Sequence, residues 1–261
     1  MLARVPWDPA QYLKFADHRL RPALDLLNRI DVADPTEVFD LGAGAGNVTR
    51  LLKARWPNAR ITGVDESQEM LAKAAAAAPE IAWQRADLAS WRPPRPADII
   101  YSNATLHWLA GHDRLFPALF AALAPGGVLA VQMPQNFSAP SHTAIGDAAR
   151  SGPWRAKLEP LLRLAPTADP AFYFDLLAPR AAALDIWETE YLQILDGDHP
   201  VREWVKGTWL RPLLDALDEP DRTQFEARYA ELVAPAYPRR PDGHTLFPFR
   251  RLFIVARAPG R

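Results

Sequence analysis

The sequence contains no cysteine. Without thiols there are no disulfide bonds and no metal sites built from thiolates. Lysine is scarce and the formal net charge is only −1, which argues against nucleic acid or an anionic membrane as the main partner. No apolar run approaches the roughly 18 residues of a membrane-spanning helix, and the first residues lack the long apolar segment of a signal peptide. We therefore expect a cytoplasmic protein that engages neither nucleic acid nor membrane.

What is present is a regular alternation of strand and helix patterns. Hydrophobic residues make up 49% of the 261 positions, enough for one large domain or for a core with a lid. Strands are expected at 36–41, 60–64, 81–85, 97–101 and 128–131, and helices at 46–56, 67–78 and 112–123. Strands separated by helices form βαβ units with right-handed crossovers. The pattern predicts an α/β protein with a doubly wound, mostly parallel sheet.

Three regions differ from that core. Residues 1–35 precede the first strand and carry a helical pattern, and residues 134–180 are rich in Pro and Ala with helical pieces near 142–150 and 154–164. Two further strands are expected at 184–195 and 251–257. Between them, residues 196–250 carry two helical patterns, at 201–217 and 221–233. Because so long a connection is usually functional, we predict a core over 36–195 and 251–261 with a helical lid over 196–250, a stabilising appendage being the alternative.

A glycine-rich loop follows the first expected strand. Asp40 ends that strand, and Gly42, Gly44 and Gly46 follow at alternate positions before a helix begins. A dinucleotide-binding loop would need a glycine where Asn47 stands, and a P-loop would need Lys followed by Ser or Thr. The remaining pattern, D-x-G-x-G-x-G, resembles motif I of the class I S-adenosylmethionine-dependent methyltransferases. A helix behind such a loop offers its free N–H groups to an anion, here the carboxylate of the cofactor.

Two more acids follow strands in the same register. Asp65 ends the second strand, where a carboxylate can accept hydrogen bonds from both ribose hydroxyls. Asp65 or Ser67 could instead cap the next helix. Asp87 follows the third strand and resembles the family residue that accepts a hydrogen bond from the adenine amino group. The resemblance implies that Leu88 or Met70 flanks the ring.

The fourth strand leads into a polar and aromatic segment, Asn103 to Trp108. Ligands of doubly wound folds bind beyond the carboxyl ends of the strands. We therefore expect Asn103 beside the cofactor, and His107 and Trp108 close to the group that receives the methyl. A surface or capping role is the alternative for His107.

At this point the resemblance becomes narrower than a superfamily. Motifs along nearly the whole chain resemble the trans-aconitate 2-methyltransferase family, in segments 7–9, 12–15, 19–22, 102–109, 129–134, 204–207, 210–212 and 251–256. Two departures stand out: His107 occupies a position that more usually carries Gln, and alanines separate the glycines where the family often has Cys and Pro. The resemblance implies a seven-stranded Rossmann-like sheet whose last strand is antiparallel, S-adenosyl-L-methionine as the cofactor and no metal.

The resemblance also implies methylation of a carboxylate of trans-aconitate or of a closely related small polycarboxylate. A carboxylate is already ionised at neutral pH, so no general base is expected. Such a substrate needs cations, and Arg grips carboxylates best. The arginine candidates are Arg19, Arg21, Arg211, Arg250 and Arg251, with Arg19 and Arg211 favoured. Trp204 could line the pocket and Tyr12 could close over the cofactor, although each could equally be core packing.

Other readings stay open at the level of sequence. The chain could methylate another small molecule, such as an amine, a hydroxyl or a different acid. It could also be an S-adenosylmethionine-binding module that regulates a partner without catalysis. A nicotinamide oxidoreductase is disfavoured by Asn47. We expect a small-molecule partner and a monomer or weak dimer.

Overall fold

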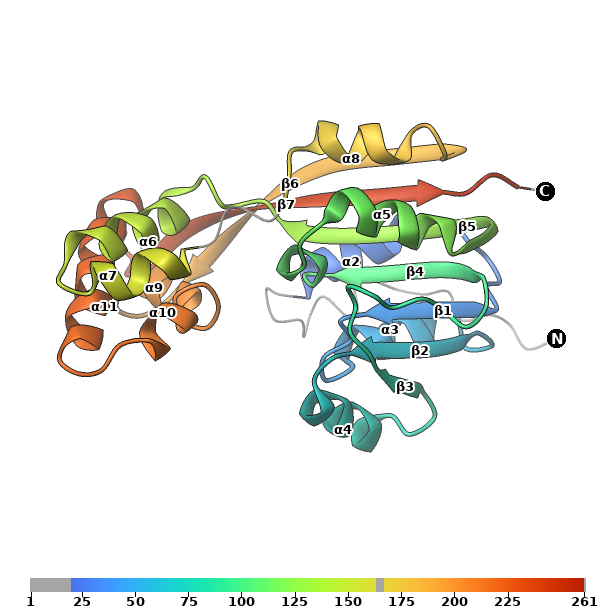
Figure 1. The fold of residues 1–261 in the computed structure, drawn as a ribbon, viewed down its shortest axis with the longest axis horizontal. Helices are drawn as coiled ribbons and strands as arrows, with labels where there is room; N and C mark the ends of the chain where they lie inside the picture. The colour runs from blue at the N-terminus through green and yellow to red at the C-terminus, as the bar shows by residue number, and fades with distance from the viewer. Residues whose placement is uncertain (1–19, 163–166, 261) are drawn as a thin grey trace. The chain divides into compact units, whose positions relative to one another are not determined.

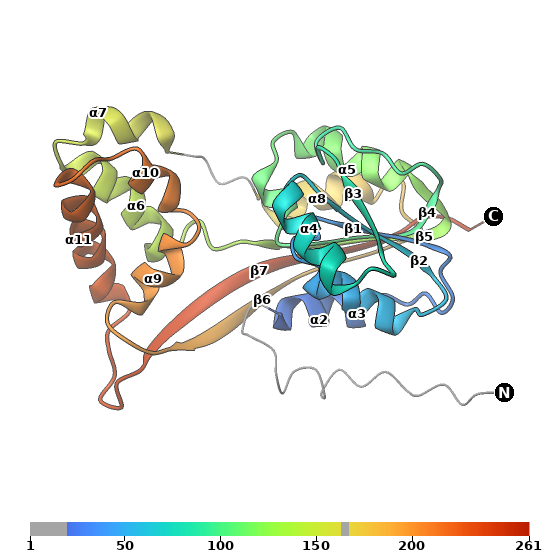
Figure 2. The same ribbon diagram turned by 90° about the horizontal axis from the view of Figure 1, so that it is seen from below.

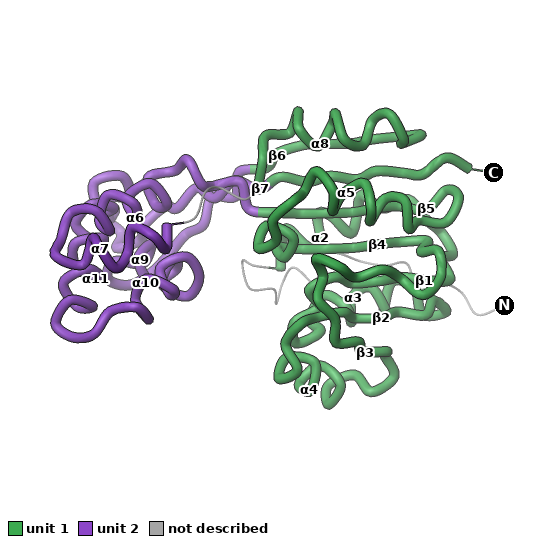
Figure 3. The backbone as a smooth tube through the Cα atoms, in the orientation of Figure 1, with its two compact units in different colours: residues 1–133, 166–189, 252–261 green, residues 134–165, 190–251 purple. Residues whose placement is uncertain are grey.

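The computed structural model describes residues 20–162 and 167–260. Tyr12 and Arg19, two of the predicted site residues, lie outside these ranges. The chain forms two compact units (Figure 3). Unit 1 comprises Met1–Met133, Pro166–Thr189 and Leu252–Arg261, and unit 2 comprises Pro134–Ala165 and Glu190–Arg251.

A seven-stranded sheet has the order β3-β2-β1-β4-β5-β7-β6 (Figure 1). Its strands are β1 (Glu37–Leu41), β2 (Arg60–Asp65), β3 (Ala82–Arg85), β4 (Ala97–Asn103), β5 (Leu123–Pro134), β6 (Ala183–Leu195) and β7 (Thr245–Arg257). Parallel pairing joins β3, β2, β1, β4 and β5. Gly126 N donates to Pro259 O and Ala258 N donates to Gly127 O, so β7 runs antiparallel to β5. The predicted α/β sheet with its antiparallel last strand is confirmed.

Helices cover both faces of the sheet in unit 1. They are α2 (Arg21–Asn28), α3 (Asn47–Arg55), α4 (Gln68–Ala77), α5 (His112–Ala121) and α8 (Pro170–Leu177), with a short 3-10 helix η1 (Leu106–Trp108) after β4. Figure 2 shows α2 and α3 on one face, and α5 and α8 on the other. The core between them is built from strand residues such as Phe39, Ile100 and Leu129, which are almost fully buried.

The strand order fixes where a ligand can bind. From β1 the chain moves outward to β2 and β3, and it then returns to β4 on the other side of β1. Asp40 of β1 is therefore in register with Gly63 of β2 on one side and with Tyr101 of β4 on the other. The strand order reverses between β1 and β4, and doubly wound sheets bind ligands beyond the carboxyl ends of the strands at such a reversal.

Unit 2 is mainly helical. It contains α6 (Pro140–Ser151), α7 (Arg155–Leu158), η2 (Glu159–Leu161), α9 (Pro200–Lys206), α10 (Arg211–Asp215), α11 (Asp221–Val233) and η3 (Ala234–Ala236). An apolar core of its own joins Trp154, between α6 and α7, to Phe225 and Tyr229 of α11 and to Phe247 of β7. Tyr229 donates a 2.8 Å hydrogen bond to Ser141 O and so ties α11 to α6.

Two helical regions differ from the expected pattern. The helix predicted over 201–217 is two helices, α9 and α10, because Gly207 ends the first and Pro212 begins the second. Helix α8 was not predicted, since its residues lie in the Pro- and Ala-rich stretch. The second unit includes Pro134–Ala165 as well as Glu190–Arg251, and the role of 196–250 as a lid stays a prediction. Across both described ranges, no helix is long and apolar enough to cross a membrane.

Candidate active site

Three glycines shape the loop between β1 and α3. Gly42, Gly44 and Gly46 have φ angles of 80°, 54° and 79°, which residues with a side chain rarely adopt. A Cβ on Gly42 would lie 2.0 Å from Thr105 Oγ1, and one on Gly46 would lie 2.5 Å from the Trp83 ring. Around a Cβ placed on Gly44, no atom of the described residues other than its chain neighbours lies within 4 Å. Two glycines thus permit close packing inside the protein, while Gly44 leaves the loop open to a ligand.

Asp65 at the end of β2 is fixed against this loop. Its Oδ2 accepts a 2.8 Å hydrogen bond from Gly44 N, and its Oδ1 accepts a 2.9 Å bond from Ser67 N. Helix α3 begins behind the loop with Gly46 as its N-cap and without a side-chain capping bond. Its first N–H groups are therefore available to an anion. The arrangement offers donors to an anionic group and a fixed carboxylate to hydroxyl groups.

Asp40 has a different environment from Asp65. It is 2% exposed, and its Oδ2 accepts a 2.6 Å hydrogen bond from Thr49 Oγ1 of α3. Burial raises the pKa of the Asp40 carboxyl to about 7, although the bond from Thr49 opposes the shift. Asp40 therefore ties α3 to β1. Direct contact between Asp40 and a cofactor stays a prediction.

The predicted adenine-binding residues follow the ends of β2 and β3. Asp87 accepts hydrogen bonds from Ala89 N at 2.9 Å and from Ser90 Oγ at 3.3 Å, so it stabilises the turn after β3. Leu88 is buried in the core of unit 1, whereas Met70 on α4 is 41% exposed. The turn leaves Asp87 with unused lone pairs. Its contact with an adenine group stays a prediction.

The chain makes a strained turn at the end of β4. Ala104 has a φ of 53°, a conformation that is costly for a residue with a Cβ and that clusters at functional sites. Beside it, Asn103 Oδ1 is buried and has no hydrogen-bond partner within residues 20–162 and 167–260. A buried oxygen without a donor is rare in native proteins. It marks a position where a ligand donor is expected.

The next residues form η1. His107 is 3% exposed and Trp108 is 44% exposed, with ring centroids 4.6 Å apart. Trp108 is thus the more accessible of the two residues predicted to position a substrate. His107 is largely enclosed by protein.

Sequence reasoning missed a network that fixes η1. His112 Nε2 donates a 2.9 Å hydrogen bond to Leu106 O, so Nδ1 must accept from the Tyr173 hydroxyl, 2.7 Å away. The Tyr173 oxygen in turn accepts a 3.1 Å bond from Ala168 N. Burial lowers the pKa of His112 and raises that of Tyr173, which keeps both side chains neutral. The network joins η1 to α5 and α8.

Of the described residues in the predicted substrate set, Arg21 begins α2 in unit 1, whereas Trp204, Arg211, Arg250 and Arg251 lie in unit 2. Trp204 packs edge-on against Phe247, with ring centroids 5.9 Å apart. Arg250 is oriented through its Nε, which donates to Gln135 O at 3.2 Å. Arg211 lies on the exposed face of α10 and pairs with Asp215 at 3.4 Å. The structure therefore holds Arg250 in place more firmly than Arg211.

A second residue missed from the sequence is His142 of unit 2. Its ring is packed against Phe137 and Trp209 at 5.4 and 5.9 Å, and its Nδ1 lies 3.1 Å from Ser141 Oγ. Burial lowers the pKa of His142 to about 4. The imidazole is therefore neutral at pH 7. Nothing in the sequence distinguishes this histidine, because Trp209, which packs against its ring, comes from a distant segment.

Comparisons with known proteins agree with this geometry. Residues 38–127 match a methyltransferase domain family. The chain is 49% identical to the trans-aconitate 2-methyltransferase of Azoarcus sp., over 96% of this chain and 98% of that protein. It is 50% identical to the enzyme of the same name from Streptomyces avermitilis, over 98% of each.

Solved structures show the fold alone. The YcgJ protein of Bacillus subtilis superposes with a TM-score of 0.59 at 16% identity, over 94% of this chain and 100% of that one. Haemonchus contortus phosphoethanolamine N-methyltransferase 2, solved with S-adenosylhomocysteine, gives a TM-score of 0.54 at 16% identity, over 92% of this chain and 52% of that one.

The sheet order, the loop opened at Gly44 and the domain match define a class I methyltransferase. In the described ranges, no group of three His, Cys, Asp or Glu residues could hold a metal ion. Within that class, the chain belongs to the trans-aconitate 2-methyltransferase family.

Proposed function

We propose that this protein methylates a carboxylate of trans-aconitate, or of a closely related small polycarboxylate, at the expense of S-adenosyl-L-methionine. The products would be the monomethyl ester and S-adenosyl-L-homocysteine. The observation that carries the proposal is the 49% identity to a trans-aconitate 2-methyltransferase over 96% of this chain, because it extends through unit 2 as well as through the sheet.

The residues around the glycine loop fit the cofactor. The open position at Gly44 and the N–H groups of α3 suit its carboxylate, and the Asp65 carboxylate suits its ribose hydroxyls. Asn103 Oδ1 is buried without a hydrogen-bond donor among the described residues, and the amino group of the cofactor would supply one. Asp87 and Met70 would face the adenine, and Tyr12 would close the site. The cofactor supplies a methyl group on a strongly electrophilic sulfonium when it is bound.

The protein's own task is positioning. The accepting carboxylate is ionised at pH 7 and needs no base. It must be held in line with the methyl group, with the reacting atoms about 3–3.5 Å apart. Trp108 and His107, on the segment after β4, would help to set that position. Water must be excluded, since each charge interaction weakens in an open site.

Arginine side chains of the predicted set would bind the other carboxylates of the substrate. Arg250 is the preferred cation because its guanidinium is already oriented by Gln135 O, so little side-chain freedom is lost on binding. Trp204 would contribute an apolar wall. Arg211 and Arg19 remain candidates from the family motifs.

The test is a competition between acids. The protein is incubated with methyl-labelled S-adenosylmethionine and, in separate reactions, trans-aconitate, cis-aconitate, isocitrate, citrate and succinate. We expect base-labile label chiefly with the aconitates. Tight cofactor binding with no labelled acid would refute the substrate while leaving the cofactor site intact.

A further inference from the structure

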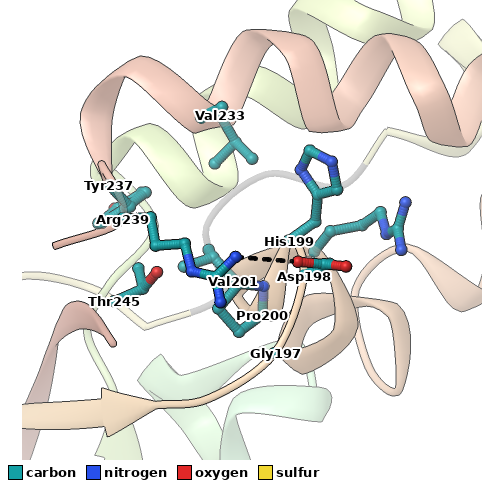
Figure 4. A pocket seen from close by; sticks show the side chains of 11 residues that line it. Gly197, Asp198, His199, Pro200, Val201, Val233, Tyr237, Arg239 and Thr245 are labelled. Carbon is teal, nitrogen blue, oxygen red and sulfur yellow. Dashed lines mark hydrogen bonds and ion pairs between the residues drawn. The ribbon is translucent and has the colours of Figure 1, made fainter. Parts of the chain in front are cut away.

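Unit 2 contains a cavity that the methyl-transfer reaction does not require. It has a volume of about 200 Å³, is partly open to solvent, and lies between the loop after β6, the end of α11 and the start of β7 (Figure 4). Its walls include the apolar residues Pro200, Val201, Val233 and Ala234. Val201 and Val233 are 3% exposed, so the inner wall is part of the core of unit 2.

The volume limits the occupant. A dry cavity of about 150 Å³ accepts benzene, whereas drug-sized ligands occupy roughly 300–1,000 Å³. A cavity of about 200 Å³ therefore suits one ring or a short chain with a single polar group.

The polar group of such a ligand would meet Arg239. Its Nη1 lies 3.3 Å from Asp198 Oδ1, and Figure 4 shows this ion pair between two residues of the lining. Both side chains are largely exposed, at 60% for Arg239 and 87% for Asp198. An ion pair so exposed contributes little, so an incoming carboxylate can replace Asp198 at low cost. Arg239 Nε donates to Gly243 O at 3.0 Å, which orients the guanidinium in advance.

The other arginine of the lining is less available. Arg202 Nη2 lies 2.7 Å from Glu203 Oε1, and Arg202 Nε lies 3.4 Å from Glu226 Oε1. Its side chain is 23% exposed, so its pairs are better shielded than that of Arg239. A carboxylate ligand would therefore exchange with Asp198 rather than with these glutamates.

The loop that walls the cavity is strained. His199 has a φ of 49° and precedes Pro200. A left-handed conformation is unfavourable for a residue with a Cβ, and a following proline restricts the residue before it further. Strain of this kind persists where the surroundings enforce it, and it clusters at ligand clamps.

We propose that this cavity binds a small monocarboxylate with an apolar ring or short chain. The carboxylate pairs with Arg239, and the apolar part fills the space against Val201, Val233 and Ala234. The methyl-transfer substrate is a poorer match, because its additional carboxylates would lie against these apolar walls or compete for Arg202, which already pairs with Glu203 and Glu226. The cavity is thus a second small-molecule site, independent of the reaction proposed above.

The test uses the full-length protein and benzoate, followed by isothermal titration and by saturation-transfer NMR. We expect benzoate to bind and benzyl alcohol, which lacks the carboxylate, to bind at least about tenfold more weakly. Arg239→Gln should weaken benzoate binding about tenfold. The matched control is Arg240→Gln, which removes the same charge from an exposed neighbour outside the lining and should leave the affinity unchanged.

Two further variants should change the affinity for benzoate in opposite directions. Asp198→Asn removes the competing carboxylate and should tighten benzoate binding roughly twofold to fivefold. Ala234→Phe, at an exposed lining position, should fill the cavity and abolish binding. Saturating trans-aconitate with S-adenosylhomocysteine should not displace benzoate.

Each reversed result overturns the proposal. Benzoate binding that survives both Arg239→Gln and Ala234→Phe would place the ligand elsewhere. Weaker binding in Asp198→Asn would mean that the acid does not compete, and displacement by trans-aconitate would assign benzoate to the substrate site. A failure to methylate any acid would leave these measurements unaffected.

Discussion

The Tyr173 hydroxyl is the most informative group to delete, because it supports η1 without lying on that segment. Tyr173 donates to His112 Nδ1 at 2.7 Å, and His112 donates to Leu106 O at 2.9 Å. The residue before Leu106 is Thr105, whose hydroxyl occupies the space that a Gly42 side chain would take. Tyr173→Phe therefore loosens the segment that packs on the glycine loop.

The expected loss of stability follows from the groups left behind. His112 Nδ1 would be buried without a donor, at a cost of about 1–3 kcal/mol. Ala168 N would also lose its acceptor, but that bond is only part-buried and water can replace it. We expect Tyr173→Phe to lower the free energy of unfolding by about 2 kcal/mol. If about 1 kcal/mol of this loss appears as a weaker free energy of cofactor binding at the glycine loop, the affinity for S-adenosylhomocysteine falls about fivefold.

Urea unfolding and isothermal titration measure the two effects separately. The matched control is Tyr229→Phe, which deletes another buried tyrosine hydroxyl whose bond to Ser141 O is 2.8 Å long, but within unit 2. Tyr229→Phe should cost similar stability and leave the affinity for S-adenosylhomocysteine unchanged. If the two variants lose the same free energy of unfolding and bind S-adenosylhomocysteine equally well, the idea that the Tyr173–His112 network positions the glycine loop is refuted.

Three further predictions concern the loop and the substrate. Gly44→Ala should lower the free energy of unfolding by only about 1 kcal/mol, because of its φ of 54°, yet weaken cofactor binding at least about tenfold by isothermal titration. Gly42→Ala should lower the free energy of unfolding by about 3 kcal/mol in urea, because its Cβ would clash with Thr105. The pKa of Asp40 is raised from 3.8 to about 7, so the stability that it contributes is fully present below pH 4 and is lost as the pH rises through 7. Asp40→Asn should therefore have a higher free energy of unfolding in urea than wild type at pH 8, and this difference should shrink toward pH 5. Arg250→Gln should raise the KM for trans-aconitate about tenfold in a labelled-methyl assay with kcat little changed, and the exposed, paired Arg211 should tolerate the same change better.

Local patterns are sufficient to predict the sheet and the cofactor loop. Strands β1 and β4 are short, largely apolar runs. Asn47 excludes the dinucleotide-binding loop, and the absence of Lys followed by Ser or Thr after Gly46 excludes the P-loop. Asp65 was predicted to bind the ribose because it ends a strand. In the structure its Oδ2 lies 2.8 Å from Gly44 N, and its contact with a ribose stays a prediction. These features depend on residues that are close in sequence or that follow the known order of βαβ units.

The remaining features depend on distant segments. His112 and Tyr173 are 61 residues apart, and Tyr173 lies on α8, which the Pro- and Ala-rich composition concealed. Helix α6 packs with α11 through contacts such as that of Tyr229 with Ser141, 88 positions away. Hydrophobic periodicity along the sequence does not predict such contacts, because they depend on which apolar faces pack together in the folded chain.

The most direct test of the proposed activity is to identify the product. The protein is incubated with trans-aconitate and S-adenosylmethionine carrying a 13C-labelled methyl group, and the product is analysed by NMR and mass spectrometry. The account predicts a single 13C methyl ester of trans-aconitate, formed in step with S-adenosylhomocysteine and hydrolysed by base. Label that resists base, or S-adenosylhomocysteine formed without a labelled ester, would contradict the carboxyl methyltransferase assignment.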